Sequence, residues 1–351
     1  MTALIIGGGL SGLALADALE TQGKDYVMLE ARARFGGRIK TEHCQGGYFD
    51  MGPTWFWPGQ PRMAALIDRL GLKKFDQFAI GDLIYENERG QVQRGRGFSS
   101  MQGSWRLQGG LGTMIQALVD RVPDHRKRLN ADVTKLTRKA TGVTALLSTG
   151  DTVEGNQVIV SMPPRVAAKI AFVQPLPQAA LTSLQNVPTW MAGQAKAVAV
   201  YDTPFWREDG LSGDAQSHFG PMVEIHDASP AHGGPYALFG FIGVPPNARA
   251  DEQTLRCHLM EQLIRLFGAK AANPTQLYVT DWAFDAYTST EADLAPLYAH
   301  PAFGLPSSLM HLWDTRLHFS GAELAPEFGG YLEGALEAAE NVLKILEIQD
   351  R

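Results

Sequence analysis

Three glycines near the start of the chain, Gly7, Gly9 and Gly12, have the spacing that lets a backbone turn hold phosphate groups. The first permits a tight turn, the second lets a pyrophosphate approach the backbone, and the third lets a helix pack against a strand. An acid, Glu30, follows where its carboxylate could accept hydrogen bonds from both hydroxyls of a ribose. These residue types in this order indicate the binding of a dinucleotide.

The neighbouring segments are those that such a turn needs. An apolar run over 4–6 predicts a buried strand, the alanine- and leucine-rich stretch over 13–20 predicts a helix, and 26–29 predicts a second strand. The N-terminus of that helix offers free N–H groups and the positive end of its dipole to a phosphate. Strand, glycine turn, helix, strand and acid therefore appear in the order of a dinucleotide-binding βαβ unit.

Two further stretches fit a planar, phosphate-bearing ligand. The adjacent glycines Gly36 and Gly37 lie between arginines, which suits a loop close to a second phosphate, since a guanidinium group binds phosphate with two hydrogen bonds. A generic surface turn explains the glycines but not the arginines. The aromatic run 55–57 either packs in the hydrophobic core or forms the wall of a site for a planar ligand.

Composition excludes several classes of protein. The 351 residues are 45% hydrophobic with a net charge of −6, which argues against a nucleic-acid partner. Short basic runs such as 125–128 are better explained as solvated surface. Two cysteines, Cys44 and Cys257, suffice neither for a disulfide framework nor for a metal site. With no signal peptide and no apolar run of membrane-spanning length, we expect a soluble protein in the reducing cytoplasm.

The apolar pattern predicts two domains of the α/β class. We expect a Rossmann-like dinucleotide-binding domain built discontinuously from 1–75, 109–175 and 301–351. The stretches 76–108 and 176–300 are expected to form a sheet-rich α+β substrate domain, with the site where the two domains meet.

Four blocks together resemble the flavin-containing amine oxidases, the group that includes monoamine and polyamine oxidases. They are 7–38 (GGGLSG…LEARARFGGR), 48–60 (YFDMGPTWFWPGQ), 158–164 (VIVSMPP) and 320–335 (SGAELAPEFGGYLEGA), and they extend over nearly the whole chain. The resemblance implies an FAD domain of the GR2 type and FAD as the cofactor. The residues that it implies for FAD binding are Gly7, Gly9, Ser11, Gly12, Glu30, Arg32, Gly36, Gly37, Arg38, Gly52, Val133, Glu323, Gly330, Tyr331 and Leu332.

The resemblance also implies how an amine would be held. In this family the amine lies between two aromatic side chains that face the flavin, and Tyr331 matches one of them. Tyr298 is the candidate for the other, and Trp55 and Trp282 are candidates to line the same pocket; for each aromatic alone, core packing is an equal explanation. The helix that starts at Tyr331 would direct its N-terminus at the flavin pyrimidine, where reduced flavin carries negative charge.

Three departures from the family pattern stand out. The family's lysine, which holds a water beside flavin N5 and assists reoxidation, is expected near 227–230, where Ser229 stands; Lys196 occupies a different motif position. The cysteine that links flavin covalently in mitochondrial members falls near Leu297, so FAD is expected to bind non-covalently. The segment 75–109 is shorter than the helical insert of larger members, which predicts a more open substrate site or one covered by a partner.

The leading functional hypothesis is an FAD-dependent oxidoreductase that oxidises an amine C–N bond by hydride transfer to flavin N5. The imine would hydrolyse, and O2 or another acceptor would reoxidise the flavin. Two alternatives stay open. One is a desaturase or oxidase of C–C bonds that resembles the phytoene desaturases and protoporphyrinogen oxidases, and the other is a non-catalytic flavin-binding module.

Overall fold

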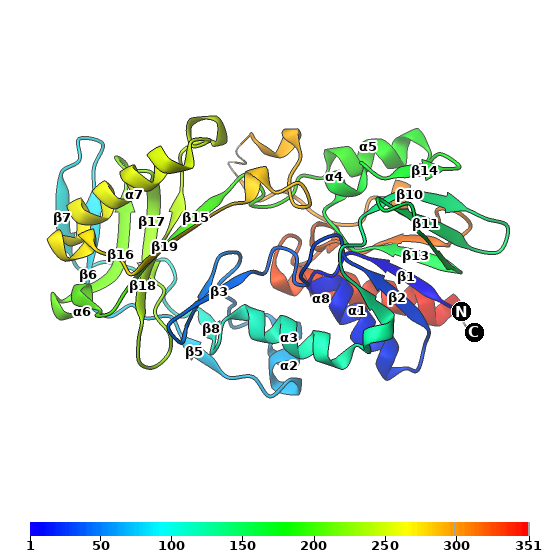
Figure 1. Cartoon of the computed structure of the whole chain (residues 1–351), viewed down its shortest axis with the longest axis horizontal. Helices are drawn as coiled ribbons and strands as arrows, with labels where there is room; N and C mark the ends of the chain where they lie inside the picture. Colours follow the sequence, from blue (N-terminus) through cyan, green and yellow to red (C-terminus); the bar gives the residue numbers. More distant parts are fainter. Residues whose placement is uncertain (296, 298, 350–351) are drawn as a thin grey trace.

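A computed structural model of the chain describes residues 1–295, 297 and 299–349 (Figure 1). Two lobes lie side by side along the long axis of the molecule, and the N-terminus lies close to the end of the last helix at Gln349, in the same lobe. This lobe contains a parallel sheet, and the other contains a large, mostly antiparallel sheet.

The parallel sheet has five strands in the order β20-β13-β1-β2-β9. Its strands are β1 (Ala3–Ile6), β2 (Tyr26–Leu29), β9 (Lys127–Arg128), β13 (Gln157–Val160) and β20 (Leu317–Phe319). The strand β1 is central, with Leu4 opposite both Val27 and Val158. Because both faces are covered, β1 and residues 158–160 of β13 are continuous apolar runs. Ligands bind such sheets at the carboxyl ends of the central strands, where the strand order reverses.

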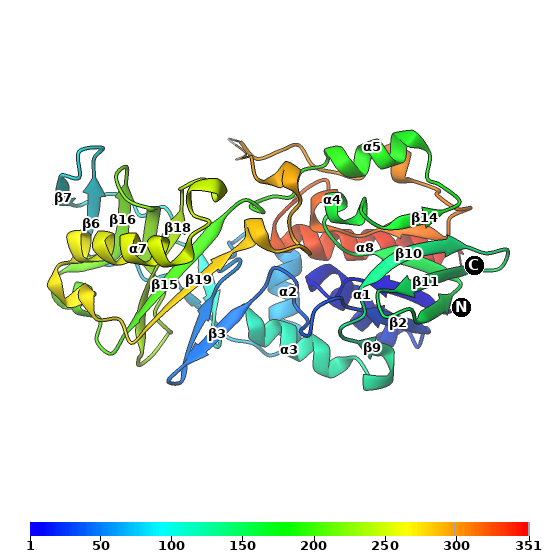
Figure 2. The same ribbon diagram turned by 45° about the horizontal axis from the view of Figure 1, so that its top comes forward.

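Helices cover one face of this sheet and a second small sheet covers the other (Figure 2). Ile5 of β1 packs toward the helices, whereas its neighbours Leu4 and Ile6 pack toward the small sheet. The helices are α1 (Leu10–Thr21), α2 (Pro61–Arg69), α3 (Leu111–Arg121) and α8 (Leu332–Gln349). The small sheet, in the order β12-β11-β10-β14, contains β10 (Val133–Arg138), β11 (Val143–Leu147), β12 (Thr152–Gly155) and β14 (Ala171–Val173), beside α4 (Pro164–Ala167) and α5 (Gln178–Asn186).

The second lobe is built on a seven-stranded sheet in the order β19-β15-β18-β17-β16-β6-β7. Its strands are β6 (Asp82–Glu86), β7 (Val92–Gly95), β15 (Ala195–Tyr201), β16 (Leu211–Ser217), β17 (Met222–Asp227), β18 (Tyr236–Ile242) and β19 (Gln276–Asp281). Neighbouring strands are antiparallel except β16 and β6. One face packs on α7 (Glu252–Phe267) and α6 (Phe205–Glu208), and the other packs on an aromatic cluster that includes Trp55 and Phe239.

Short elements connect the lobes. The hairpin of β3 (Thr41–Cys44) and β4 (Gly47–Asp50) and the pair β5 (Lys74–Asp76) and β8 (Trp105–Leu107) lie between the two large sheets. Single 3-10 turns occur at Asp124–Arg126, Pro246–Ala248, Ala269–Ala272, Trp282–Phe284, Glu291–Asp293, Ser307–Leu309 and Ala322–Leu324.

The architecture confirms the predicted α/β class with a Rossmann-like domain and a sheet-rich second part. The exact division into domains at 75, 109, 175 and 301 stays a proposal, supported by the way β6 and β7 join the large sheet. In the described part of the chain, every helix is too short or too polar to cross a bilayer.

Candidate active site

A cavity of about 840 Å³ extends from the carboxyl edge of the parallel sheet to the inner face of the seven-stranded sheet. The site residues expected from the sequence that line it are Gly7, Gly9, Ser11, Glu30, Arg32, Gly36, Gly37, Arg38, Gly52, Trp55, Val133, Trp282, Gly330, Tyr331 and Leu332. Gly12 and Glu323 lie behind this lining, and Tyr298 lies outside the described residues. The cavity brings together segments from both ends of the chain, and its volume suits a small-molecule cofactor and substrate.

The opening turn is shaped for close contact with a ligand. Gly7 has a φ of 107°, and a Cβ there would lie 2.3 Å from the carbonyl oxygen of Ser161. A Cβ at Gly12 would lie 2.0 Å from the carbonyl oxygen of Gly7, so only glycine lets α1 pack this close to β1. At Gly9 a Cβ would meet nothing nearer than 4.0 Å, which leaves the backbone open toward the cavity.

Glu30 is buried at the end of β2 and already accepts two backbone hydrogen bonds. Gly8 N donates to Oε2 at 2.7 Å and Arg32 N donates to Oε1 at 2.8 Å. These bonds fix both carboxylate oxygens at the cavity wall, and each oxygen keeps one acceptor site for a ribose hydroxyl. The guanidinium of Arg32 bonds Asp285 at 2.5 Å and Thr288 at 3.1 Å, so the segment that follows β19 is tied to this end of the cavity.

Arg38 and Glu323 form a two-point ion pair at the wall of the cavity. The N···O distances are 2.5 Å (Nη1 to Oε1) and 3.0 Å (Nη2 to Oε2), and Glu323 is fully buried. Glu323 therefore orients Arg38, which does line the cavity. The hydroxyl of Ser11 donates to the carbonyl oxygen of Ser320 at 2.5 Å, so the side chain of Ser11 links α1 to the chain after β20.

Two features of the described residues fit FAD in this cavity. Ser161 Oγ is buried at the cavity wall without a hydrogen-bond partner, and a polar ligand would satisfy it. The first turn of α8 begins at Leu332, two residues after Gly330 (φ 80°), and its free N–H groups lie at the part of the cavity that Tyr331 and Leu332 line. A glycine cradle at one end and a helix N-terminus further along match a long cofactor with negative charge at both places.

Aromatic side chains line the far part of the cavity. Trp282 Nε1 donates to Met51 O at 3.0 Å, and Trp55 Nε1 donates to Gln77 Oε1 at 2.8 Å, so both indoles are held by their polar edges. The ring of Tyr331 stacks on His300, with 5.0 Å between ring centroids. One face of the Tyr331 ring is therefore covered by His300, and Tyr331, Trp55 and Trp282 all contribute surface to the cavity.

The expected position of the lysine was wrong. Ser229 does not line the cavity; it caps a turn, where its N–H donates to Asp227 Oδ1 at 2.8 Å. Lys196 lines the cavity instead. Its ammonium group donates to Asp50 O at 2.8 Å, to Gly52 O at 3.0 Å and to Thr54 Oγ1 at 2.5 Å. Burial lowers the pKa of Lys196 to about 7.

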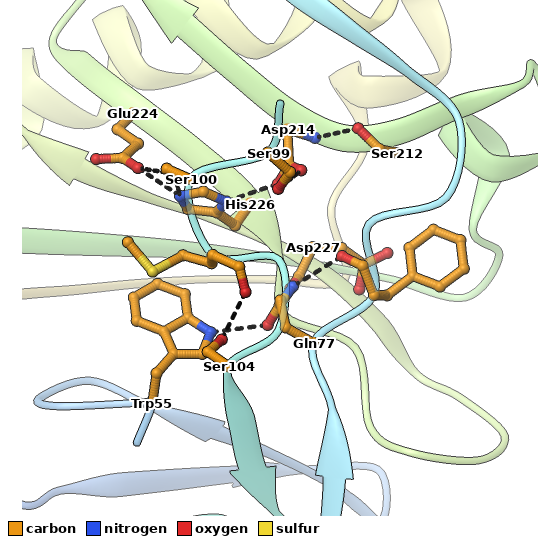
Figure 3. Close-up of polar contacts among 12 residues, drawn as sticks. Trp55, Gln77, Ser99, Ser100, Ser104, Ser212, Asp214, Glu224, His226 and Asp227 are labelled. Carbon is orange, nitrogen blue, oxygen red and sulfur yellow. Dashed lines mark hydrogen bonds and ion pairs between the residues drawn. The ribbon is translucent and has the colours of Figure 1, made fainter. Parts of the chain in front are cut away.

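A signal for Lys196 was present in the sequence. A lysine inside the otherwise apolar strand β15, which is buried along its whole length, needs dedicated partners and therefore marks a site. Sequence reasoning also missed Glu224, a carboxylate of β17 on the cavity wall. Its hydrogen-bond partner His226 is two residues along the strand, and the imidazole lies edge-on to Trp55 (Figure 3).

The fold and this cavity define an FAD-dependent oxidoreductase. The chain belongs to the flavin-containing amine oxidoreductase family, whose model matches residues 10–97 and 80–342. It is similar to the flavin-containing amine oxidase B of Sus scrofa, at 24% identity over 97% of this chain and 85% of the relative. It is also similar to an L-amino acid dehydrogenase of Synechocystis sp., at 23% identity over 98% of this chain and 94% of the relative.

Solved structures show the same fold. Putrescine oxidase with putrescine bound superposes with a TM-score of 0.82 at 21% identity, over 99% of each chain. The alignment with the Sus scrofa enzyme extends over 446 residues, although this chain has 351. The relative therefore contains insertions that are absent here.

Proposed function

We propose that the protein oxidises an amine C–N bond at the aromatic end of its cavity. One observation carries the proposal: a single cavity joins the glycine cradle at Gly7 and Gly9 to a compartment lined by Tyr331, Trp282 and Lys196. Bound FAD would supply a hydride acceptor at N5, after which the imine hydrolyses in solution and O2 or another acceptor restores the cofactor.

The chain's own residues account for cofactor binding. Glu30 would hold the adenosine ribose, the backbone at Gly9 and the N-terminus of α1 the pyrophosphate, and Arg38 a phosphate or ribityl group. The first turn of α8 would stabilise negative charge on the pyrimidine. The two cysteines lie in β3 and α7, and neither lines the cavity, which supports non-covalent binding.

At the substrate end, Tyr331, Trp55 and Trp282 would orient the amine and exclude water. Two of these rings are held through their indole N–H groups, so their faces are pre-positioned before substrate binds. A neutral amine needs no strong general base, which fits a compartment of aromatics and backbone groups. Lys196 would fill the role of the family's lysine, because three oxygen acceptors fix its ammonium group at the cavity wall.

The carboxylate of Glu224 favours an amine over the C–C substrates of desaturases. An extended hydrocarbon gains nothing from a partly exposed carboxylate on the cavity wall, whereas an ammonium group does. The test is an anaerobic panel on the holoenzyme, with primary, secondary and polyamines in one set and unsaturated hydrocarbons and porphyrinogens in another. We expect amines alone to bleach the flavin absorbance. Bleaching by the second set alone would replace this proposal with C–C oxidation.

A further inference from the structure

Two cationic side chains, Lys196 of β15 and Arg106 of β8, are buried at the end of the cavity that Lys196 lines. They are 3% and 2% exposed. The ammonium group of Lys196 bonds only neutral oxygens, namely two backbone carbonyls and the hydroxyl of Thr54. Arg106 likewise donates to the carbonyl oxygens of Ala228 at 2.9 Å and Ser229 at 2.8 Å. Within the described part of the chain, neither cation is bonded to a carboxylate.

A single buried acid, Asp50 of β4, accompanies the two cations. It is 5% exposed, and its Oδ1 accepts hydrogen bonds from Thr41 Oγ1 at 2.5 Å and from Leu111 N at 3.0 Å. Leu111 is the first residue of α3, so the carboxylate lies at a helix N-terminus, which favours its ionised form. Burial raises the pKa of Asp50, whereas the hydrogen bond from Thr41 and the charges of Lys196 and Arg106 oppose that rise.

The charges of this cluster do not cancel. Asp50 favours the proton on Lys196, and Arg106 opposes it. The other acid that acts on Arg106 is Asp227, which already forms a two-point ion pair with Arg207, with N···O distances of 2.7 Å and 2.8 Å. With Lys196 protonated, two cations and one anion leave one net positive charge in a buried place. Removal of the Lys196 proton relieves this charge at little cost.

The rest of the surroundings of Lys196 is aromatic or already paired. Its Nζ lies 4.2 Å from the ring centroid of Phe239, and the rings of Trp55 and Phe241 lie at 5.7 Å and 5.9 Å. Other charged side chains nearby have partners of their own, which are Glu42 for Lys40 at 2.8 Å and His226 for Glu224 at 2.9 Å. Asp50 and Arg106 are therefore the groups that decide the charge of Lys196.

The charge of Lys196 matters because its ammonium group lies at the cavity wall. In the proposed function, Lys196 assists the reaction of reduced flavin with O2. In that reaction O2 takes two electrons from the flavin and leaves, with two protons, as hydrogen peroxide. A fixed cation stabilises the negative charge that develops during electron transfer, and a neutral amine does not. The rate of reoxidation should therefore follow the protonation of Lys196.

We propose that Asp50 and Arg106 are positioning residues that set the charge of Lys196, Asp50 by favouring the ammonium form and Arg106 by opposing it, and that they thereby set the pH at which the reduced enzyme reacts with O2. Neither Asp50 nor Arg106 lines the cavity, so both act through Lys196. The inference rests on the role that the proposed function gives to Lys196, and it adds control of the same site by pH.

The first test measures the protonation of Lys196 on the oxidised holoenzyme. Protein labelled with 13C at the lysine Cε atoms is titrated by NMR, and the Lys196 resonance is the one that Lys196→Met lacks. We expect its midpoint to fall by about 1 pH unit in Asp50→Asn and to rise by about 1 pH unit in Arg106→Gln. Arg106→Lys keeps the charge and should keep the wild-type midpoint. Asp68→Asn, at an exposed acid of α2, is the control for the loss of a carboxylate.

The second test follows the reaction with O2. The flavin is reduced by light, so that no amine is needed, and the rate constant of reoxidation is measured by stopped flow from about pH 5.5 to about pH 9.5. We expect the rate constant to fall at high pH, with a midpoint that moves down in Asp50→Asn and up in Arg106→Gln. General loosening of the fold would lower the rate at every pH and would not move the two midpoints in opposite directions.

The outcomes are distinct. Midpoints that stay in place, or that move in the same direction in both variants, would overturn the proposal. NMR midpoints that move as expected while the rate constant ignores pH would overturn the link to O2. If the midpoints move oppositely but no amine reduces the flavin, the proposed amine oxidation fails and the roles of Asp50 and Arg106 stand. Should Arg106→Gln not fold, Asp50→Asn is compared with Asp50→Glu, which keeps the charge and should keep the wild-type midpoint.

Discussion

Lys196 Nζ lies 3.0 Å from the carbonyl oxygen of Gly52, so a strand of the seven-stranded sheet is bonded to the turn after β4. Gly52 has no room for a side chain, since a Cβ would lie 1.9 Å from the carbonyl oxygen of Arg38. The ammonium group, the turn and the arginine loop therefore meet at one point of the cavity. This contact links the cofactor-binding half of the site to the substrate half.

Replacing Lys196 tests its assigned role. In Lys196→Met, we expect reoxidation of reduced flavin by O2 to slow about 100-fold, the size typical of a lost proton-transfer or polar catalytic group. Stopped-flow mixing of reduced enzyme with oxygenated buffer measures the rate. Lys270→Met, at an exposed lysine, is the control. An unchanged rate in Lys196→Met would assign reoxidation to other groups.

Replacing Glu323 tests whether this residue supports FAD binding through its ion pair with Arg38. In Glu323→Gln, Arg38 loses a two-point ion pair with a fully buried carboxylate, and its guanidinium is no longer fixed toward the cavity. We expect the Kd for FAD to rise about 10- to 100-fold, measured by fluorescence titration of the apoprotein. Arg89→Gln, an exposed arginine in the β6–β7 turn, should bind FAD as wild type does. Equal affinity in Glu323→Gln would contradict the role of the pair.

Substitution of Gly12 tests the packing of the opening turn. A Cβ at this position would overlap the carbonyl oxygen of Gly7, so Gly12→Ala should lower the free energy of unfolding by about 1–3 kcal/mol and weaken FAD binding. Urea denaturation measures the first effect. Gly95→Ala is the matched control, because a Cβ there meets open space and its φ is ordinary. Equal stability of the two variants would show that α1 can shift to make room.

Tyr331 distinguishes an enzyme from a flavin-binding module. In Tyr331→Ala we expect FAD to stay bound, because the first turn of α8 starts at Leu332, but anaerobic reduction by amine to slow about 100-fold as the substrate loses orientation. Rapid-scan absorbance follows the reduction. Unchanged kinetics would remove Tyr331 from the site.

Burial by itself would lower the pKa of His226, but the hydrogen bonds to Asp214 and Glu224 outweigh burial and raise it, which predicts a pH-dependent contribution to stability. The folded state keeps the imidazole proton to a higher pH than the unfolded state does. The stabilisation is therefore complete below the pKa of His226 in the unfolded state. It is lost as the pH rises through the pKa of His226 in the folded state. The difference in unfolding free energy between wild type and His226→Gln should be larger at about pH 6 than at about pH 9. A difference that grows with pH would mean that His226 is neutral in the folded state.

The sequence allowed prediction of what depends on local pattern. The glycine turn and Glu30 lie within one continuous motif, so their places at the cavity followed from spacing, whereas the place of the α8 start was implied by the family resemblance. The position of the family's lysine was assigned to Ser229 and not to Lys196, because linear spacing does not show which face of a buried strand meets the cavity. Glu224 and His226 meet Asp214 only through the pairing of β16 with β17 and a bulge, which are long-range features. Tyr298, predicted as the second aromatic of the substrate site, lies outside the described residues and stays a prediction.

Amine oxidation is tested most directly by single-turnover reduction of the holoenzyme. Purified yellow protein is mixed anaerobically with 1,4-diaminobutane or with the same amine deuterated at the carbons that bear nitrogen, and the flavin absorbance is followed. We predict complete bleaching by both and a several-fold slower reaction with the deuterated amine, because the C–H bond breaks in the step that reduces the flavin. A flavin that stays oxidised with 1,4-diaminobutane and with every other amine would contradict the account.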